Sequence, residues 1–199
     1  MSCELTSNAN HTKSSKWGLF FVSVTGGLAT VLSVICIPFV SPALRKVCLP
    51  YVPATTKQVD NIINALSGRK GTLIDLGSGD GRIVLAAAKT GFRAYGVELN
   101  PFLVAYSKMT ALTQGLSSNA SFFRGDLWKC NLANYSNVVI FGVSQMMTEL
   151  ESKFRFELET NTFIIACRFP LPNSKPLATI GHGIDTVWVY KMPLENIDS

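Results

Sequence analysis

Residues 71–100 read GTLIDLGSGDGRIVLAAAKTGFRAYGVELN, and this stretch decides the fold. It begins with a short β-prone run at residues 72–74, which is followed by an acid, Asp75. Three glycines then stand at alternate positions: Gly77, Gly79 and Gly81. A helical run over residues 82–89 comes next, and a second strand ends on another acid, Glu98. A strand, a helix and a strand in this order predict a parallel sheet covered by helices.

The residue types in this unit indicate a cofactor that contains a nucleoside. Glycines let the backbone turn tightly and approach a ligand closely. The first turn of the helix after Gly81 offers free N–H groups to an electron-rich ligand. Glu98, at the carboxyl end of its strand, is placed to accept hydrogen bonds from the two ribose hydroxyls. We therefore expect the cofactor at the point where the strand order of the sheet reverses.

The spacing of the glycines separates two classes of cofactor. The NAD fingerprint is G-x-G-x-x-G, whereas this chain reads G-x-G-x-G and has Arg82 at the sixth position. The carboxylate of Asp75 beside the turn would repel a pyrophosphate but tolerate a cofactor with a positively charged centre. The acid–glycines–acid pattern resembles that of the class I S-adenosylmethionine-dependent methyltransferases. A glycine-rich turn without a ligand is the alternative.

In class I methyltransferases the first acid and the glycine loop hold the methionine end of the cofactor, and the second acid holds the ribose. An acid after the third strand, here Asp126, often contacts the adenine amino group in that family. The resemblance thus implies that S-adenosyl-L-methionine is bound by Asp75, Gly77, Ser78, Gly79, Gly81, Glu98 and Asp126.

The rest of the chain continues the pattern of an α/β domain. Further strands are predicted at residues 121–124, 137–141 and 162–166, and a fully apolar strand such as 137–141 suits the centre of a parallel sheet. A last pair of strands, split by Gly-His-Gly, predicts an antiparallel hairpin at the sheet edge. We expect an α/β fold, a class I (Rossmann-like) methyltransferase sheet with a terminal antiparallel hairpin, preceded by one N-terminal transmembrane helix.

The composition points to a membrane-inserted piece and away from other classes. The chain has 199 residues, of which 47% are hydrophobic, and its mean hydropathy is positive. Lys and Arg are scattered and the net charge is only +5, so a nucleic-acid partner is not expected. The five cysteines form no C-x-x-C pair and there are only two histidines, so a metal site is not expected either.

The N-terminal region divides by composition. Residues 1–16 form a polar tail, and residues 17–40 contain no charged residue. As a helix the latter run would be about 36 Å long, enough to cross a hydrocarbon core of ~30 Å. A signal peptide has a shorter apolar core, and a buried helix of a soluble domain rarely lacks a polar face. We expect a transmembrane or targeting helix there, a connector over 41–54, and a methyltransferase domain over 55–199.

The turn after the fourth strand bears on the methyl acceptor. Methyltransferases that act on amide or nucleobase nitrogens carry an N-P-P-Y type turn there, whereas this chain reads Phe141-Gly142-Val143-Ser144. This difference favours an amine substrate. Tyr51, Phe141 and Gln145 are the residues we expect on the substrate side, lining a lysine channel. No residue stands out as a general base, so catalysis is expected to rest on alignment and desolvation.

Several stretches together resemble one small family. ALRKVCLPYVPATTKQV, IDLGSGDGRIVLAAAKTGF, VELNP, YSNVVIFGVSQMM and IACRFPLP are similar to the mitochondrial membrane-anchored lysine methyltransferases, over residues 16–190. Phe102 and His182 depart from the Trp and Glu that this family tends to have.

The resemblance implies trimethylation of a lysine in a hydrophobic protein of the mitochondrial inner membrane, with the c subunit of ATP synthase as the expected substrate. It also implies a single-pass anchor in that membrane. Two other classes stay open: a methyltransferase of a small or lipid-like molecule, and a non-catalytic S-adenosylmethionine-binding membrane protein.

Overall fold

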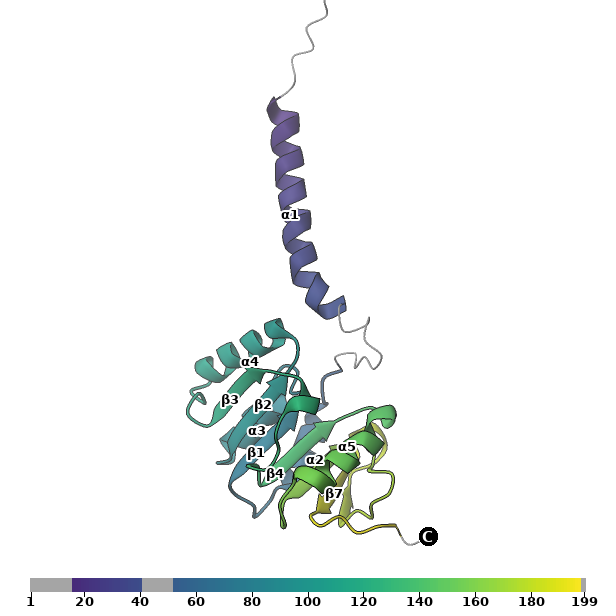
Figure 1. The fold of residues 1–199 in the computed structure, drawn as a ribbon. Coiled ribbons are helices and arrows are strands. Elements are labelled where there is room, and N and C mark those ends of the chain that lie inside the picture. The colour runs from purple at the N-terminus through teal and green to yellow at the C-terminus, as the bar shows by residue number, and fades with distance from the viewer. Residues whose placement is uncertain (1–15, 41–51, 198–199) are drawn as a thin grey trace, which may run out of the picture. The chain divides into compact units, whose positions relative to one another are not determined.

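The computed structural model describes residues 16–40 and 52–197, and the chain forms two compact units. One unit contains helix α1, Lys16–Val40, and the other contains all remaining helices and strands (Figure 1). The expected polar tail and most of the expected connector, including Tyr51, lie outside the described residues. The predicted division into tail, helix, connector and catalytic domain therefore stays a prediction.

Helix α1 exposes apolar side chains along its length. Leu19, Phe21 and Val22 are 64%, 59% and 69% exposed, and the other described side chains of this helix are exposed as well. The hydroxyl of Thr25 donates to a carbonyl oxygen one turn earlier in the helix, at 2.8 Å, and the hydroxyl of Thr30 does the same. These threonines therefore satisfy their hydroxyls within the helix.

Within the described part of the chain, no helix combines the length and the apolar character that crossing a membrane requires. The prediction of a transmembrane helix over residues 17–40 is therefore not confirmed, although the residues are helical.

The second unit is built on a seven-stranded sheet of order β3-β2-β1-β4-β5-β7-β6. Strands β1 to β5 pair in parallel, and β7 pairs antiparallel with both β5 and β6. The predicted run of parallel strands followed by an antiparallel hairpin is confirmed. The strands are β1 Thr72–Leu76, β2 Arg93–Glu98, β3 Ala120–Arg124, β4 Asn137–Phe141, β5 Phe163–Cys167, β6 Ala178–Ile180 and β7 Val187–Lys191.

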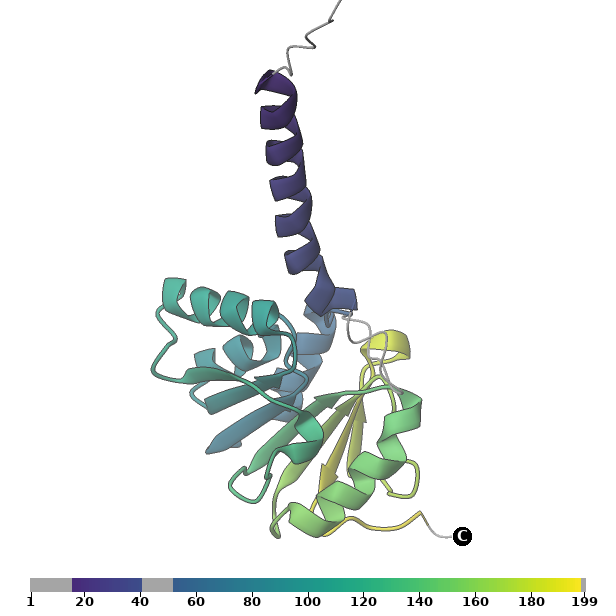
Figure 2. The ribbon, with the colours of Figure 1, turned by 45° about the horizontal axis from the view of Figure 1, so that its top comes forward.

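Helices cover both faces of this sheet (Figure 2). The hydroxyl of Thr55 caps α2, and Asn100 caps α4 ahead of a proline at the first helical position. Short 3-10 helices follow β3 and β6. The helices are α2 Thr56–Ala65, α3 Arg82–Lys89, α4 Pro101–Thr113, η2 Leu127–Lys129, α5 Ser144–Glu157 and η3 Gly183–Asp185.

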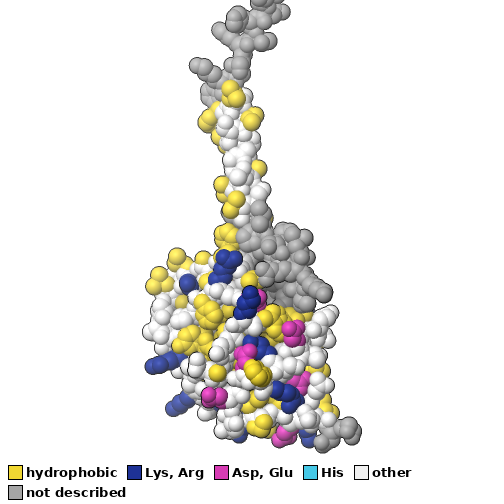
Figure 3. All heavy atoms as spheres, viewed as in Figure 1, with side chains coloured by type: hydrophobic (Ala, Val, Ile, Leu, Met, Phe, Trp, Pro, Cys, Tyr) yellow, Lys and Arg dark blue, Asp and Glu magenta, His cyan; other side chains and the backbone are white. Residues whose placement is uncertain are grey.

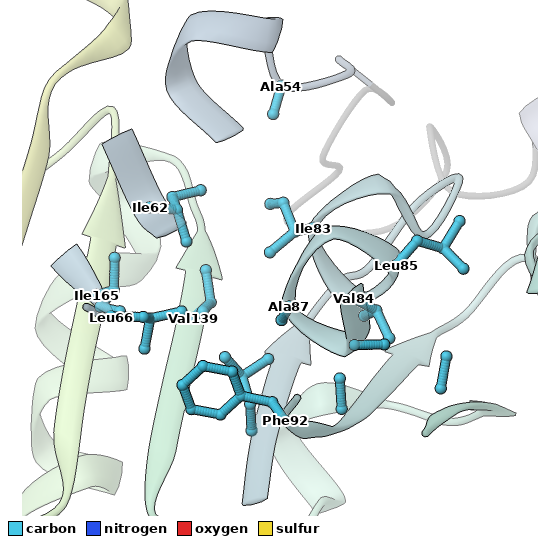
Figure 4. Packing of buried hydrophobic residues seen from close by; sticks show 14 of the residues in the cluster. Ala54, Ile62, Leu66, Ile83, Val84, Leu85, Ala87, Phe92, Val139 and Ile165 are labelled. Carbon is cyan, nitrogen blue, oxygen red and sulfur yellow. The ribbon is translucent and has the colours of Figure 1, made fainter. Parts of the chain in front are cut away.

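Two hydrophobic cores form because neighbouring residues of a strand point to opposite faces. Leu73 belongs to a core that includes residues of α2, α3 and α4, whereas its neighbour Ile74 belongs to a core that includes residues of α5. Figure 4 shows the first core, in which Ile62 and Leu66 lie beside Val139 and Ile165 of the central strands. Both cores fix the ends of the central strands, where the predicted site residues stand.

Candidate cofactor-binding site

Four of the predicted site residues lie at one edge of the sheet. Asp75 is next to the last residue of β1, Glu98 ends β2, Asp126 follows β3 by two residues and Phe141 ends β4. These strands are parallel, so their carboxyl ends share this edge. Strand β1 lies between β2 and β4, so the chain order reverses beside it. Ligands of open α/β sheets bind at such a switch point.

The glycine loop between β1 and α3 is fastened to the end of β2. The amides of Gly77 and Ser78 both donate to the carbonyl oxygen of Val97, at 2.9 and 3.0 Å. All three loop glycines have positive φ, a conformation that other residues rarely adopt: Gly77 (81°), Gly79 (53°) and Gly81 (81°). The backbone geometry therefore accounts for the alternate glycines, and it leaves this loop without side chains at three positions.

Glu98 joins the glycine loop to the start of α4. Its Oε2 accepts a hydrogen bond from the amide of Gly79 at 3.0 Å, and its Oε1 accepts one from the amide of Asn100 at 2.8 Å. A carboxylate has about four acceptor positions, so each oxygen can accept a further bond from a ligand hydroxyl. The sequence places Glu98 at the site, but these two amide contacts are visible only in the structure.

Asp75 is the most unusual group at this edge. Its side chain is 1% exposed, and neither carboxylate oxygen has a hydrogen-bond partner among the described residues. The hydroxyl of Ser78, itself buried, also lacks a partner there. Burial, and then the negative charges of Glu98 and Asp80, raise the pKa of Asp75 to about 8. A ligand that brings hydrogen-bond donors and positive charge would satisfy this carboxyl group.

Arg82 binds the glycine loop to the segment that precedes α2. Its guanidinium pairs with the carboxylate of Asp80, with Nε 3.0 and 2.9 Å from the two oxygens, and it donates to the carbonyl oxygen of Ala54. From the sequence alone, Arg82 indicates only that this loop differs from the NAD fingerprint, which has glycine at that position. The acid–x–base spacing is the local signal for the pair, but the contact with Ala54 depends on the tertiary fold.

Asp126 holds the turn after β3. Its Oδ1 accepts a hydrogen bond from the amide of Trp128 at 3.1 Å, and its side chain is half-buried. The amide of the preceding Gly125 donates to the carbonyl oxygen of Glu98 at 3.0 Å. The two acids therefore end adjacent strands that are joined at their carboxyl ends, and Asp126 has a second oxygen for a ligand donor.

The residues predicted on the substrate side are only partly brought together. Phe141 is half-buried at the end of β4, Gln145 is exposed in the first turn of α5, and Tyr51 lies outside the described residues. Arg168, which the sequence did not indicate, follows β5 with a φ of 75° and has its guanidinium carbon 5.8 Å from the centre of the Phe141 ring. No signal in the sequence marks a non-glycine residue with this backbone conformation.

No group of three or more possible metal-binding side chains gathers among the described residues. The described part of this edge presents carboxylates and backbone amides. Such an arrangement can hold a cationic nucleoside ligand: Glu98 has acceptor positions for hydroxyls, and Asp75 is a buried group that gains from a donor or a positive charge.

Two protein-family models match the chain. The ANTKMT methyltransferase domain matches residues 75–178, which include the glycine loop and the strand ends described above. The N-terminal domain of the ATP synthase c-subunit lysine N-methyltransferases matches residues 14–45, which include α1.

Relatives that match over most of this chain have names that correspond to these two families. The ATP synthase c-subunit lysine N-methyltransferase of Rattus norvegicus is 56% identical over 180 residues, covering 90% of this chain and 83% of the relative. Adenine nucleotide translocase lysine N-methyltransferase of Mus musculus is 41% identical over 177 residues, covering 86% and 77%.

A solved structure shares the fold. It is an RNA methyltransferase from Salinibacter ruber in complex with S-adenosyl-L-homocysteine, with a TM-score of 0.68 and 28% identity over 74% of this chain and 98% of that one. This likeness confirms the class I, Rossmann-like methyltransferase fold of the second unit.

Proposed function

The chain belongs to the family of ATP synthase c-subunit lysine N-methyltransferases, and on this premise we propose that it methylates a lysine of the ATP synthase c subunit, with S-adenosylmethionine as methyl donor. The observation that carries the proposal is the 56% identity to a relative of that name across 90% of the chain. Identity to the translocase methyltransferase is lower, at 41%, which favours the c subunit over the translocase as the substrate.

The residues at the carboxyl edge fit the cofactor. S-Adenosylmethionine supplies an activated methyl group on a positively charged sulfur. Glu98 would accept hydrogen bonds from its ribose hydroxyls, and Asp126 one from the adenine amino group. The carboxyl group of Asp75 and the hydroxyl of Ser78, which have no hydrogen-bond partner among the described residues, would face the methionine end beside Gly77, Gly79 and Gly81.

The chain's own contribution to methyl transfer is alignment and exclusion of water. The acceptor lysine has to arrive as a neutral amine, because an ammonium group has no lone pair. Phe141, Gln145 and Tyr51 are the residues we assign to the channel through which it arrives. Holding amine and methyl group in line replaces an encounter in solution by a reaction within one complex. Repetition on the same nitrogen yields trimethyl-lysine.

Attachment to a membrane through α1 is the second part of the proposal. Its apolar side chains are exposed on the helix, and the family's N-terminal domain includes this segment. Burying exposed apolar side chains in lipid is favourable by about 25 cal/mol per Å². With the c subunit as substrate, the membrane is the inner membrane of the mitochondrion. Tethering there raises the local concentration of enzyme near its substrate.

Carbonate extraction of mitochondria tests this attachment. The full chain should stay in the membrane pellet, and a chain with α1 residues Leu19, Phe21 and Val22 changed to Ser should be released. Protease protection then distinguishes a helix that spans the bilayer from one that lies on it. Release of the unaltered chain by carbonate would refute anchoring by insertion.

The activity is tested by incubating the full chain with methyl-labelled S-adenosylmethionine and membranes that contain the unmethylated c subunit. We expect label on one lysine of this subunit, and none with the Glu98→Ala variant. Label on a lipid or a small molecule would instead support a different acceptor. Cofactor binding without label transfer to any membrane component would support a non-catalytic protein.

A further inference from the structure

Helix α4, Pro101–Thr113, carries an apolar stripe that the sheet does not cover. Tyr106, Met109 and Leu112 are 59%, 61% and 64% exposed. They stand three residues apart, so they share one face of the helix. The opposite face, with Val104, Ser107 and Ala111, is buried against the sheet. Figure 3 shows hydrophobic side chains gathered over α4 on this face of the unit.

The segment that contains this stripe carries only positively charged side chains. From Leu99 to Gly125 the chain contains no Asp or Glu, and its only charged residues are Lys108 and Arg124. Both are exposed, and Lys108 precedes Leu112 by four residues, so these two side chains are neighbours on the surface of α4. An apolar face with a basic side chain beside it, in a segment that contains no carboxylate, complements the surface of an anionic bilayer.

Helices α2 and α5 of this unit do not expose such an apolar stripe. Helix α2 exposes Lys57 and Asp60, and α5 exposes both Glu149 and Phe156, the latter to 90%. A single exposed aromatic residue among mixed charges is ordinary at a protein surface. Three large apolar side chains on one helix face without an acid are not, and such a patch marks an interaction site.

The place of α4 connects this stripe to the cofactor-binding edge. The helix begins three residues after Glu98, whose Oε1 accepts the amide hydrogen of Asn100, the residue that caps α4. Lipid contact along α4 would therefore set the orientation of the edge that holds Glu98. A substrate lysine that emerges from a membrane needs such an orientation.

We infer that the Tyr106–Met109–Leu112 face of α4, with Lys108, docks on the surface of an anionic phospholipid bilayer and orients the cofactor-binding edge toward it. This inference deepens the proposed function and rests on it for the membrane-embedded substrate. Exposed apolar side chains beside the basic Lys108, in a segment without a carboxylate, favour an anionic lipid surface over a protein segment as the occupant. Tyr at the margin of the stripe suits the interfacial region, where its ring and hydroxyl meet different environments.

Photocrosslinking of the full chain tests the docking surface directly. Tyr106 is replaced by the photoreactive p-benzoylphenylalanine, and the matched control replaces Phe156 of α5 in the same way. Each protein is bound to vesicles of phosphatidylcholine, with or without phosphatidylglycerol, and irradiated. We expect lipid adducts at position 106 in yields several times those at position 156, and a higher yield with phosphatidylglycerol. Lys108→Gln should lower the yield at position 106 about fivefold on anionic vesicles.

Adducts to the ATP synthase c subunit in place of lipid, in vesicles that contain both, would overturn the inference in favour of a protein contact. Equal yields at the two positions, or no adduct, would also overturn it. These readouts need no methyl transfer, so they stand even if the proposed activity fails. In an activity assay, the triple variant Tyr106→Ser, Met109→Gln, Leu112→Gln should lose about tenfold in methylation of the membrane-embedded c subunit. Its affinity for S-adenosylmethionine, and the activity of Phe156→Ser, should be unchanged.

Discussion

The carboxylate of Glu98 accepts a hydrogen bond from the backbone amide of Gly79 at 3.0 Å, so the acid that ends β2 holds the glycine loop that follows β1. The same carboxylate holds the amide of Asn100 at the start of α4. Glu98 is therefore both a proposed cofactor ligand and the link between two loops of the site.

Replacing Glu98 by Ala should abolish measurable binding of S-adenosylmethionine while the chain remains folded. Hydrogen bonds to charged groups are worth about 1.5–3 kcal/mol each, and the variant loses the proposed ribose contacts. The free energy of unfolding should fall by about 1–3 kcal/mol, because two loop amides also lose their acceptor. Calorimetric titration and chemical denaturation measure the two effects. Glu98→Gln, which keeps one acceptor oxygen, is the control and should bind with intermediate affinity; unchanged binding by Glu98→Ala would show that the ribose assignment is wrong.

The carboxyl group of Asp75 should make stability depend on pH. Its pKa is raised to about 8 in the folded chain, while in the unfolded chain it ionises near pH 4. Between these values the folded state holds a proton that the unfolded state has lost. The free energy of unfolding should therefore fall as pH rises from about 4 to about 8, by up to ~1.4 kcal/mol per pH unit from this group.

Chemical denaturation of the Asp75→Asn variant between about pH 4 and pH 8 checks whether Asp75 causes the fall in the free energy of unfolding. The neutral amide should remove the slope and leave the variant more stable than the unaltered chain at pH 8. Asp60→Asn, on the exposed face of α2, is the control and should retain the slope. Binding of cationic S-adenosylmethionine near pH 7 should release a proton, seen by calorimetry in buffers of different ionisation enthalpy. The same slope in Asp75→Asn would assign it to other groups.

Gly96 of β2 should not tolerate a side chain, although its φ is ordinary. A Cβ there would lie 2.6 Å from the Oγ of Ser78 and 2.8 Å from the ring of Phe122. We expect Gly96→Ala to lower the free energy of unfolding by about 1–3 kcal/mol through overpacking, and to weaken cofactor binding by displacing Ser78. Gly26→Ala, where an added Cβ meets nothing within 4 Å, is the control. Normal stability and binding of Gly96→Ala would mean that the loop has more room than the structure gives it.

Glu151 of α5 should be needed to hold the C-terminal segment. Its buried carboxylate accepts hydrogen bonds from Asn173, Ser174 and Arg155. Burial alone would raise the pKa of Glu151, but these donors lower it below the ordinary value, so this contribution to stability is lost as pH falls. Glu151→Gln should lower the free energy of unfolding by about 2 kcal/mol. Glu149→Gln, exposed on the same helix, should change it by less than about 0.5 kcal/mol; equal effects would contradict the role of the buried network.

Local sequence patterns predicted much of this fold. The apolar runs of β1, β4 and β5 specify their strands within short windows, so the parallel strands and the final hairpin could be predicted. The position of Asp75, Glu98 and Asp126 at one sheet edge follows from the rule that parallel strands end together. The span predicted over residues 17–40 is not confirmed.

Contacts between distant segments were beyond the sequence. The guanidinium of Arg82 reaches the carbonyl oxygen of Ala54, and Arg168 lies over Phe141 in a backbone conformation that no neighbouring residue signals. The burial of Asp75 without a hydrogen-bond partner among the described residues is likewise visible only once the surrounding elements are packed. Each of these features depends on the arrangement of whole elements rather than on a local pattern.

The most direct test of the central claim is the mass of the ATP synthase c subunit in cells that lack this protein, with and without its re-expression. We predict that the c subunit lacks lysine methylation in the deficient cells, and that the unaltered chain restores a mass increase of up to three methyl groups on one lysine. The Glu98→Ala variant should not restore it. A fully methylated c subunit in cells without the protein would contradict the claim.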